Sequence, residues 1–364
     1  MRRITLPEVR ECLRQGVPVQ NADLSGLDLS GEDLSGGRFL HIEGNDVRFT
    51  GATLDAVLFQ NARLSGADFS RGRLNQCVFV ECNLSEALFT ESSAEESRWV
   101  NPKISGTQFA SASLRRASFV SPRLEEVSFT GADLERASFI EGVFGRVDFS
   151  GCRLIKTSFV GGDLSTCRLF GATFHNPIFV KAVLQGLDFS GMEIPFLQAS
   201  ECDMSRTRWE NARVMQGNFY RSNLSGAIFD KAVSEKSMFA ESTLEGISFK
   251  SGRFSMSSFQ NVKAADADFS HADLKFSPFT RADLPRANFS GANLAFCDFS
   301  HTRLEGALFR GADLNRAIFH QVSETGADFG ASSRPLAQES DPERAEAESF
   351  LPRNFDTEEG RHDR

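Results

Sequence analysis

The chain has 364 residues, of which 40% are hydrophobic, so it is long enough to bury a large core. Its formal net charge is −9, and no apolar run approaches the roughly 18 residues of a membrane-spanning helix. A mild acidic balance argues against nonspecific binding to nucleic acid or anionic membranes, because both need basic patches.

The first twenty residues predict a helical cap that leads into the main domain. One side of a short helix over residues 5–15 is apolar: Leu6, Val9, Cys12 and Leu13. Thr5 can cap its start, and Gly16 can end it. The segment has no apolar stretch typical of a signal peptide, so we expect a cytoplasmic protein. Export by a route that needs no signal peptide stays open.

Residues 21–330 repeat every five residues. Between Leu24 and Phe329, positions ending in 4 or 9 are nearly always large and apolar, mostly Leu and Phe respectively. The position two before each large residue is usually small, and the other three positions are mostly polar. Exceptions at the small position include Glu32, Leu187 and Met192.

A period of five matches neither a helix nor a simple strand. It fits a chain that turns a corner every five residues, with the large and small residues inside, because alternate residues of a strand share a face. Four sides close a coil of twenty residues, and coils stack at about 4.8 Å. The sequence therefore predicts an all-β solenoid of about 15 coils, roughly 75 Å long.

Several units, including ADLSG, ADFSR, ANFSG, ANLAF and ADLNR, resemble A(D/N)LxX, the signature of the pentapeptide-repeat family. The resemblance covers residues 21–330 and implies a right-handed quadrilateral β-helix. The predicted N-terminal helix is followed by GVPVQNADLSGLDLSGEDLSGG. Within the family, this arrangement resembles pentapeptide proteins associated with type VI secretion clusters of Gram-negative bacteria.

Residues 331–364 form an acidic tail rich in Glu, Arg, Ala, Ser and Pro. This composition predicts that most of the tail is disordered. A short helix over 342–349 can begin at Asp341 and Pro342. Glu324 falls at an inward position, which indicates that the solenoid is ending there.

Cysteine and histidine give little sign of catalytic or metal chemistry. Six of the seven Cys occupy small inward positions: Cys77, Cys82, Cys152, Cys167, Cys202 and Cys297. A small buried hydrophobe belongs there, and the sequence has no CxxC motif. His301 and His320 would lie on adjacent coils, which makes a weak metal site at best. We therefore predict no enzymatic activity, no cofactor and no metal site.

Outward positions twenty residues apart stack along the rod, and one such column is aliphatic over six consecutive coils: Val80, Val100, Val120, Ile140, Val160 and Val180. The column is mostly polar further on, so the repeat itself does not require it. β-Branched residues also suit strands, which is the alternative explanation. Because contiguous exposed apolar patches usually mark interfaces, we predict that this column binds a protein partner or a second copy.

A second outward column is apolar on three successive coils: Met256, Phe276 and Phe296. We predict that these side chains also bind a partner, although they could instead fold over a corner onto neighbouring coils. Nearer the N-terminus the same column holds three cations: Arg116, Arg136 and Lys156. Stacked like charges repel unless an acid, such as Glu135, neutralises them.

We expect a non-enzymatic rigid scaffold or adaptor, and the resemblance to type VI proteins implies an accessory role in secretion. Some pentapeptide-repeat proteins instead mimic DNA and bind DNA gyrase or topoisomerase IV through a strongly acidic face. Residues 21–330 carry 31 basic against 38 acidic side chains, which disfavours mimicry. Four Arg occupy positions where such mimics favour Asp: Arg38, Arg48, Arg63 and Arg73. A translocated effector is a third alternative.

Overall fold

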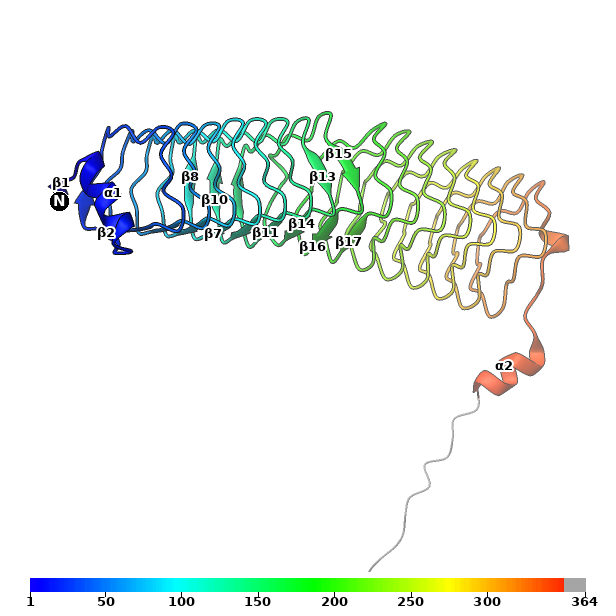
Figure 1. Ribbon diagram of the computed structural model, residues 1–364. Coiled ribbons are helices and arrows are strands. Elements are labelled where there is room, and N and C mark those ends of the chain that lie inside the picture. Colours follow the sequence, from blue (N-terminus) through cyan, green and yellow to red (C-terminus); the bar gives the residue numbers. More distant parts are fainter. Residues whose placement is uncertain (350–364) are drawn as a thin grey trace, which may run out of the picture.

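The computed structural model describes residues 1–349 and shows a parallel β-solenoid with a helix near each end (Figure 1). Its largest sheet has ten strands: β2 (Val19–Gln20), β4 (Arg38–Leu40), β5 (Leu58–Gln60), β6 (Val78–Val80), β7 (Arg98–Val100), β9 (Ser118–Val120), β11 (Ser138–Ile140), β14 (Ser158–Val160), β16 (Ile178–Val180) and β17 (Gln198–Ser200). The smaller sheets contain the remaining strands: β1 (Arg2–Arg3) with β3 (Ala22–Asp23), β8 (Lys103–Ser105) with β10 (Arg123–Glu125) and β12 (Val143–Gly145), and β13 (Arg153–Ile155) with β15 (Thr173–His175).

Within the solenoid, each strand pairs in parallel with one twenty residues away, as the repeat predicts. For example, Phe119 aligns with Phe139, and Phe139 aligns with Phe159. The largest sheet has fewer strands than the predicted number of coils. Beyond Ser200 the same register continues as isolated bridges, as far as Ile318 with Gln338.

The chain turns because nearly every fifth residue adopts a positive φ. At a typical corner the Ala52 N–H donates to the Phe49 carbonyl (2.9 Å), and Gly51 between them has φ 65°. A positive φ at the third residue defines a type II turn, which glycine adopts without steric cost. Corner geometry, together with the twenty-residue register, gives each coil four sides.

The Phe and Leu side chains fill the interior, where nearly all are shielded from solvent. Phe119 stacks on Phe139 with ring centroids 4.8 Å apart, close to the spacing of hydrogen-bonded strands. It also meets Phe129 on the opposite face edge-on, at 84° and 6.1 Å. This ring ladder, which is interrupted at Leu169 and Ala199, explains the 35 Phe and the single Tyr, because a phenol would need a buried hydrogen-bond partner.

Helix α1 (Leu6–Arg14) covers the first coil, as the N-terminal pattern predicts. Val9, on the inner side of this helix, is fully buried. The Glu8 carboxylate accepts hydrogen bonds from the Thr5 N–H and the Thr5 hydroxyl, both at 2.8 Å. These bonds, led by the Thr5 N–H, lower the pKa of Glu8 and fix the start of the helix.

At the C-terminal end of the solenoid, Arg334 of the 3₁₀ helix η1 (Arg334–Leu336) packs over the last Phe rings of the interior. Its guanidinium lies 4.2 Å from the Phe319 centroid and 5.2 Å from that of Phe329. It also pairs with Glu324 at 3.4 Å, which accounts for a carboxylate at an inward position. Helix α2 (Pro342–Ser349) occupies the range expected from Asp341 and Pro342. The rest of the predicted tail, 350–364, lies outside the described residues.

Candidate functional site

The six residues of the aliphatic column lie in register on the ten-stranded sheet. Val80 pairs with Val100, which pairs with Val120 on the next strand. All six side chains are half-buried. We call the outer surface of this sheet, together with its bridged continuation over residues 218–320, the sheet face. Because the aliphatic column coincides with the strands, its β-branched residues also favour the local backbone.

Met256, Phe276 and Phe296 occupy corners two residues before Ser258, Pro278 and Asp298, which continue the ladder of the sheet face. Their exposed fractions are 54%, 44% and 37%. The Phe276 and Phe296 rings stack at 4.8 Å, so these side chains pack partly on one another. The Lys275 ammonium lies 5.0 Å from the Phe276 centroid.

Both predicted sets therefore lie on or beside one face of the rod, the first in its N-terminal half and the second in its C-terminal half. The structure adds Met238, which lies on this face and is 46% exposed. The sequence analysis missed Met238, although its position, twenty residues from Ser258, places it in the same column of the repeat.

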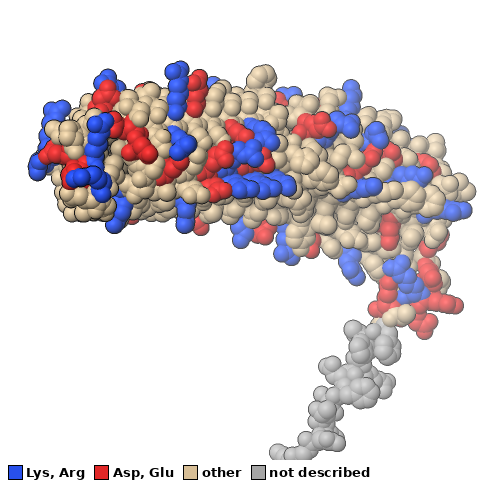
Figure 2. Space-filling model, in the orientation of Figure 1, with Lys and Arg blue, Asp and Glu red and all other residues tan. Residues whose placement is uncertain are grey.

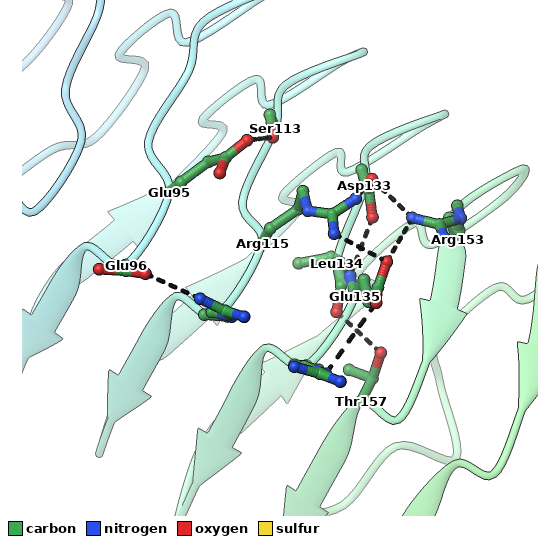
Figure 3. Close-up of polar contacts among 11 residues, drawn as sticks. Glu95, Glu96, Ser113, Arg115, Asp133, Leu134, Glu135, Arg153 and Thr157 are labelled. Carbon is green, nitrogen blue, oxygen red and sulfur yellow. Dashed lines mark hydrogen bonds and ion pairs between the residues drawn. The ribbon is translucent and has the colours of Figure 1, made fainter.

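A charged network lies beside the aliphatic column (Figure 3). Glu135 accepts ion pairs from Arg115 (3.2 Å), Arg153 (2.7 Å) and Arg136 (4.0 Å). Its hydrogen bond raises the pKa of Arg153. The prediction that Glu135 neutralises this region is thus met at Arg136, while Arg116 pairs with Glu96 at 3.0 Å. Figure 2 shows acidic and basic side chains intermingled over the visible side of the rod.

The buried cysteines have a structural role. Burial raises the pKa of Cys77, Cys82, Cys152 and Cys167 to about 12, and that of Cys202 to about 11. The Cys77 thiol donates to the Leu54 carbonyl at 2.8 Å, and Cys297 donates to the Leu274 carbonyl at 3.0 Å. Such thiols stay protonated at neutral pH, so they are poor nucleophiles and poor metal ligands.

His301 and His320 are neighbours, and Nε2 of each lies 3.1 Å from the Glu348 carboxylate of helix α2. These three residues could in principle hold a metal ion. However, the Asp341 N–H donates to Nδ1 of His320 at 3.2 Å. Nε2 of a neutral His320 therefore carries the proton and donates to Glu348. In this tautomer Nε2 has no lone pair for a metal, so the cluster acts as a tether for helix α2.

No helix among residues 1–349 is long and apolar enough to cross a membrane.

The pentapeptide-repeat family model matches this chain in eight copies, at residues 45–80, 103–139, 132–169, 253–294 and 292–329. The chain belongs to the pentapeptide-repeat family. A search of curated protein sequences found no significant match.

Three solved pentapeptide-repeat structures are similar to this chain. HetL, involved in heterocyst differentiation regulation in the cyanobacterium Nostoc sp. strain PCC 7120, is 18% identical; the match covers 79% of this chain and 90% of HetL, with a TM-score of 0.29. A protein of the Arabidopsis thaliana thylakoid lumen is 26% identical, covering 33% of this chain and 69% of that one, with a TM-score of 0.25. QnrB1, a plasmid-mediated fluoroquinolone resistance protein, is 19% identical, covering 50% and 87%, with a TM-score of 0.16.

Proposed function

We propose that this protein is a non-enzymatic scaffold that binds a protein partner, or a second copy, through the sheet face. The main support is the six-residue aliphatic column, which remains half-exposed on consecutive coils. The apolar corners at Met256, Phe276 and Phe296 extend the apolar character of the same face. Interfaces are typically built around such apolar and aromatic side chains, with a polar rim.

The surroundings of the column suit a protein partner. Arg116 and Arg136 line one edge of the strands, and Asn101, Ser121 and Glu141 follow the column at its other edge. An apolar centre between polar borders resembles the core and rim of a protein interface. A rigid rod can present this surface without reorganisation, which lowers the entropic cost of binding.

The test is a double substitution, Val120→Lys with Val160→Lys, which places two charges in the middle of the aliphatic column. Its matched control is Thr90→Lys with Thr130→Lys, because these residues hold the same position within their pentapeptides on the opposite side of the coil and are also two coils apart. We expect the first variant to lose partners that the wild type and the control capture from host extracts, or to lose self-association in sedimentation. Equal capture and equal sedimentation by all three proteins would refute the proposal.

The finer assignment that we propose is a cytoplasmic accessory protein of type VI secretion, with a translocated bacterial effector as a separate alternative. It rests on the N-terminal segment alone. Co-expression with the secretion genes, and loss of effector delivery on deletion, are the expected results. Mimicry of DNA is disfavoured by the intermingled charges, so purified protein should leave supercoiling by DNA gyrase unchanged.

A further inference from the structure

The hydrogen-bond ladder between coils is interrupted where residues 167–174 face residues 187–194. On the same side one coil earlier the bonds are present: the Phe149 N–H donates to the Arg168 carbonyl at 2.8 Å, and the Gly151 N–H donates to the Phe170 carbonyl at 2.9 Å. Among the described residues a shorter interruption precedes them, where the Phe144 and Arg146 N–H groups lack bonds to residues 163–165. Within residues 1–349, the equivalent bonds to the next coil are missing at three N–H groups: Leu169, Gly171 and Phe174. The return bonds from Asp188 and Glu193 are missing as well among these residues.

The same two coils remain joined on the sheet face. Ile178 pairs with Gln198, and Phe179 pairs with Ala199. The coils are therefore closed along one side and open along the opposite side. Figure 1 shows them spreading apart next to β15, where the rod changes direction.

Oversized inward residues explain the opening. Leu187 and Met192 fill consecutive inward positions that are usually small, and Phe174 fills a position that is usually Leu. At Phe254, which takes a Leu position in a regular part of the ladder, glycine provides room: a Cβ on Gly252 would lie 2.4 Å from the Phe254 ring. No glycine relieves Phe174 in this way, because Ala172 precedes it and Met192 follows on the next coil. Excess volume in a close-packed interior forces the backbone to shift.

A crevice follows the opening. It encloses about 420 Å³ between Leu169 and Phe170 on one side and Leu187, Asp188 and Met192 on the other. Phe170 stands at its rim with 84% of its surface exposed. Leu169 and Leu187 are 6% and 7% exposed, whereas Phe129 and Leu134 in a regular coil are fully buried.

We propose that this crevice binds an extended peptide segment of a partner protein by parallel β-strand addition. The two coils that line the crevice present backbone N–H and C=O groups that form hydrogen bonds between neighbouring coils elsewhere in the rod. An inserted strand can form hydrogen bonds with these groups. An extended peptide alternates its side chains, so one apolar side chain can enter the crevice while its neighbours meet Phe170 at the rim. This binding mode uses the opposite side of the rod from the sheet face and is independent of it.

The test uses a fluorescein-labelled peptide, VSFTGADLER, as a probe. This sequence, residues 127–136, occupies the same two sides of the solenoid two coils earlier, so it carries the strand and corner pattern that the crevice lacks. We expect fluorescence anisotropy to show saturable binding to the wild type. Leu187→Ala with Met192→Ala restores small inward residues and closes the coils, so its affinity should be at least tenfold lower.

Two controls separate strand addition from simple apolar contact. A peptide with Pro in place of Ser128 and Asp133 keeps the apolar side chains but lacks two ladder donors, and it should bind at least tenfold more weakly. The sheet-face variant Val120→Lys with Val160→Lys should bind the probe as the wild type does. If the closed variant does not fold, Phe170→Ser changes only an exposed side chain and should weaken binding at least threefold. Absent binding, or equal affinity for the open and closed forms or for the two peptides, overturns the proposal.

Discussion

Two properties decide which residue types fit the inward positions of this rod: the volume of the side chain, and its ability to form one recurrent hydrogen bond. A hydroxyl or thiol at a small position donates to the carbonyl of the large residue 23 positions earlier, as Thr107 does to Leu84 and Ser242 to Phe219. Beside the two Trp residues, the hydroxyl at the small position also accepts a hydrogen bond from the indole. Nε1 of Trp99 donates to Ser97, and Nε1 of Trp209 donates to Thr207, so each indole has a buried polar partner two residues before it.

Volume complementarity predicts the effect of Gly252→Ala. The added methyl group would collide with the Phe254 ring, so we expect a loss of about 1–3 kcal/mol in the free energy of unfolding. The double variant Gly252→Ala with Phe254→Leu recreates the usual pairing of a small residue with Leu and should recover most of the loss. Urea denaturation of the single and double variants measures this coupling. Additive losses in the double variant would contradict the packing explanation.

The thiols give a second prediction at this scale. Cys12 is half-exposed, whereas the other six are buried, with pKa values raised by desolvation. A raised pKa keeps these thiols protonated at pH 8, so iodoacetamide should modify the native protein once, at Cys12. All seven should react after unfolding. Mass spectrometry that finds early labelling of Cys77 or Cys152 would show that the interior is open.

Among the elements, the terminal caps decide how far each end of the stack stays ordered. The end coils have no neighbour on one side, so their rings depend on helix α1 and on Arg334. Arg334→Ala removes a cation from two rings and leaves Glu324 without its partner. We expect faster amide exchange over residues 304–329, with exchange unchanged over residues 44–69. A cation–π contact of this kind contributes about 0.5–2 kcal/mol. If the substitution left the exchange rates over residues 304–329 unchanged, or raised them equally in both regions, a capping role would be contradicted.

Some structural elements could be predicted from the sequence, and others could not. An uninterrupted period of five fixes both the corners and the twenty-residue register, so the solenoid, helix α1 and the common side of the two apolar columns follow from residue numbering. The strands themselves were not predictable, because every unit has a similar pattern but only some form more than isolated bridges. The opening at Leu187 and Met192 was visible as an exception to the pattern. Whether neighbouring residues could absorb the extra volume depends on packing, which the sequence pattern does not show.

At the scale of the whole molecule, the rod combines a regular interior with a few local departures on its surface. Ion pairs join many charges of one coil to those of another, such as Arg48 with Asp28 (2.8 Å) and Arg221 with Glu241 (2.7 Å). These exposed pairs contribute little stability. Because they mix charges of both signs, the visible side of the rod has no large region of one charge. The surfaces that we propose for recognition are the apolar sheet face and the crevice opposite it.

Photo-crosslinking tests most directly whether the sheet face is the binding surface. Benzoylphenylalanine is placed at Val120 on the sheet face or at Thr130 on the opposite side, and each variant is irradiated in cells that naturally make the protein. The proposal predicts a discrete crosslinked protein adduct from position 120 and none from position 130. The same adduct from position 130, or no adduct from position 120, would contradict a partner docked on the sheet face.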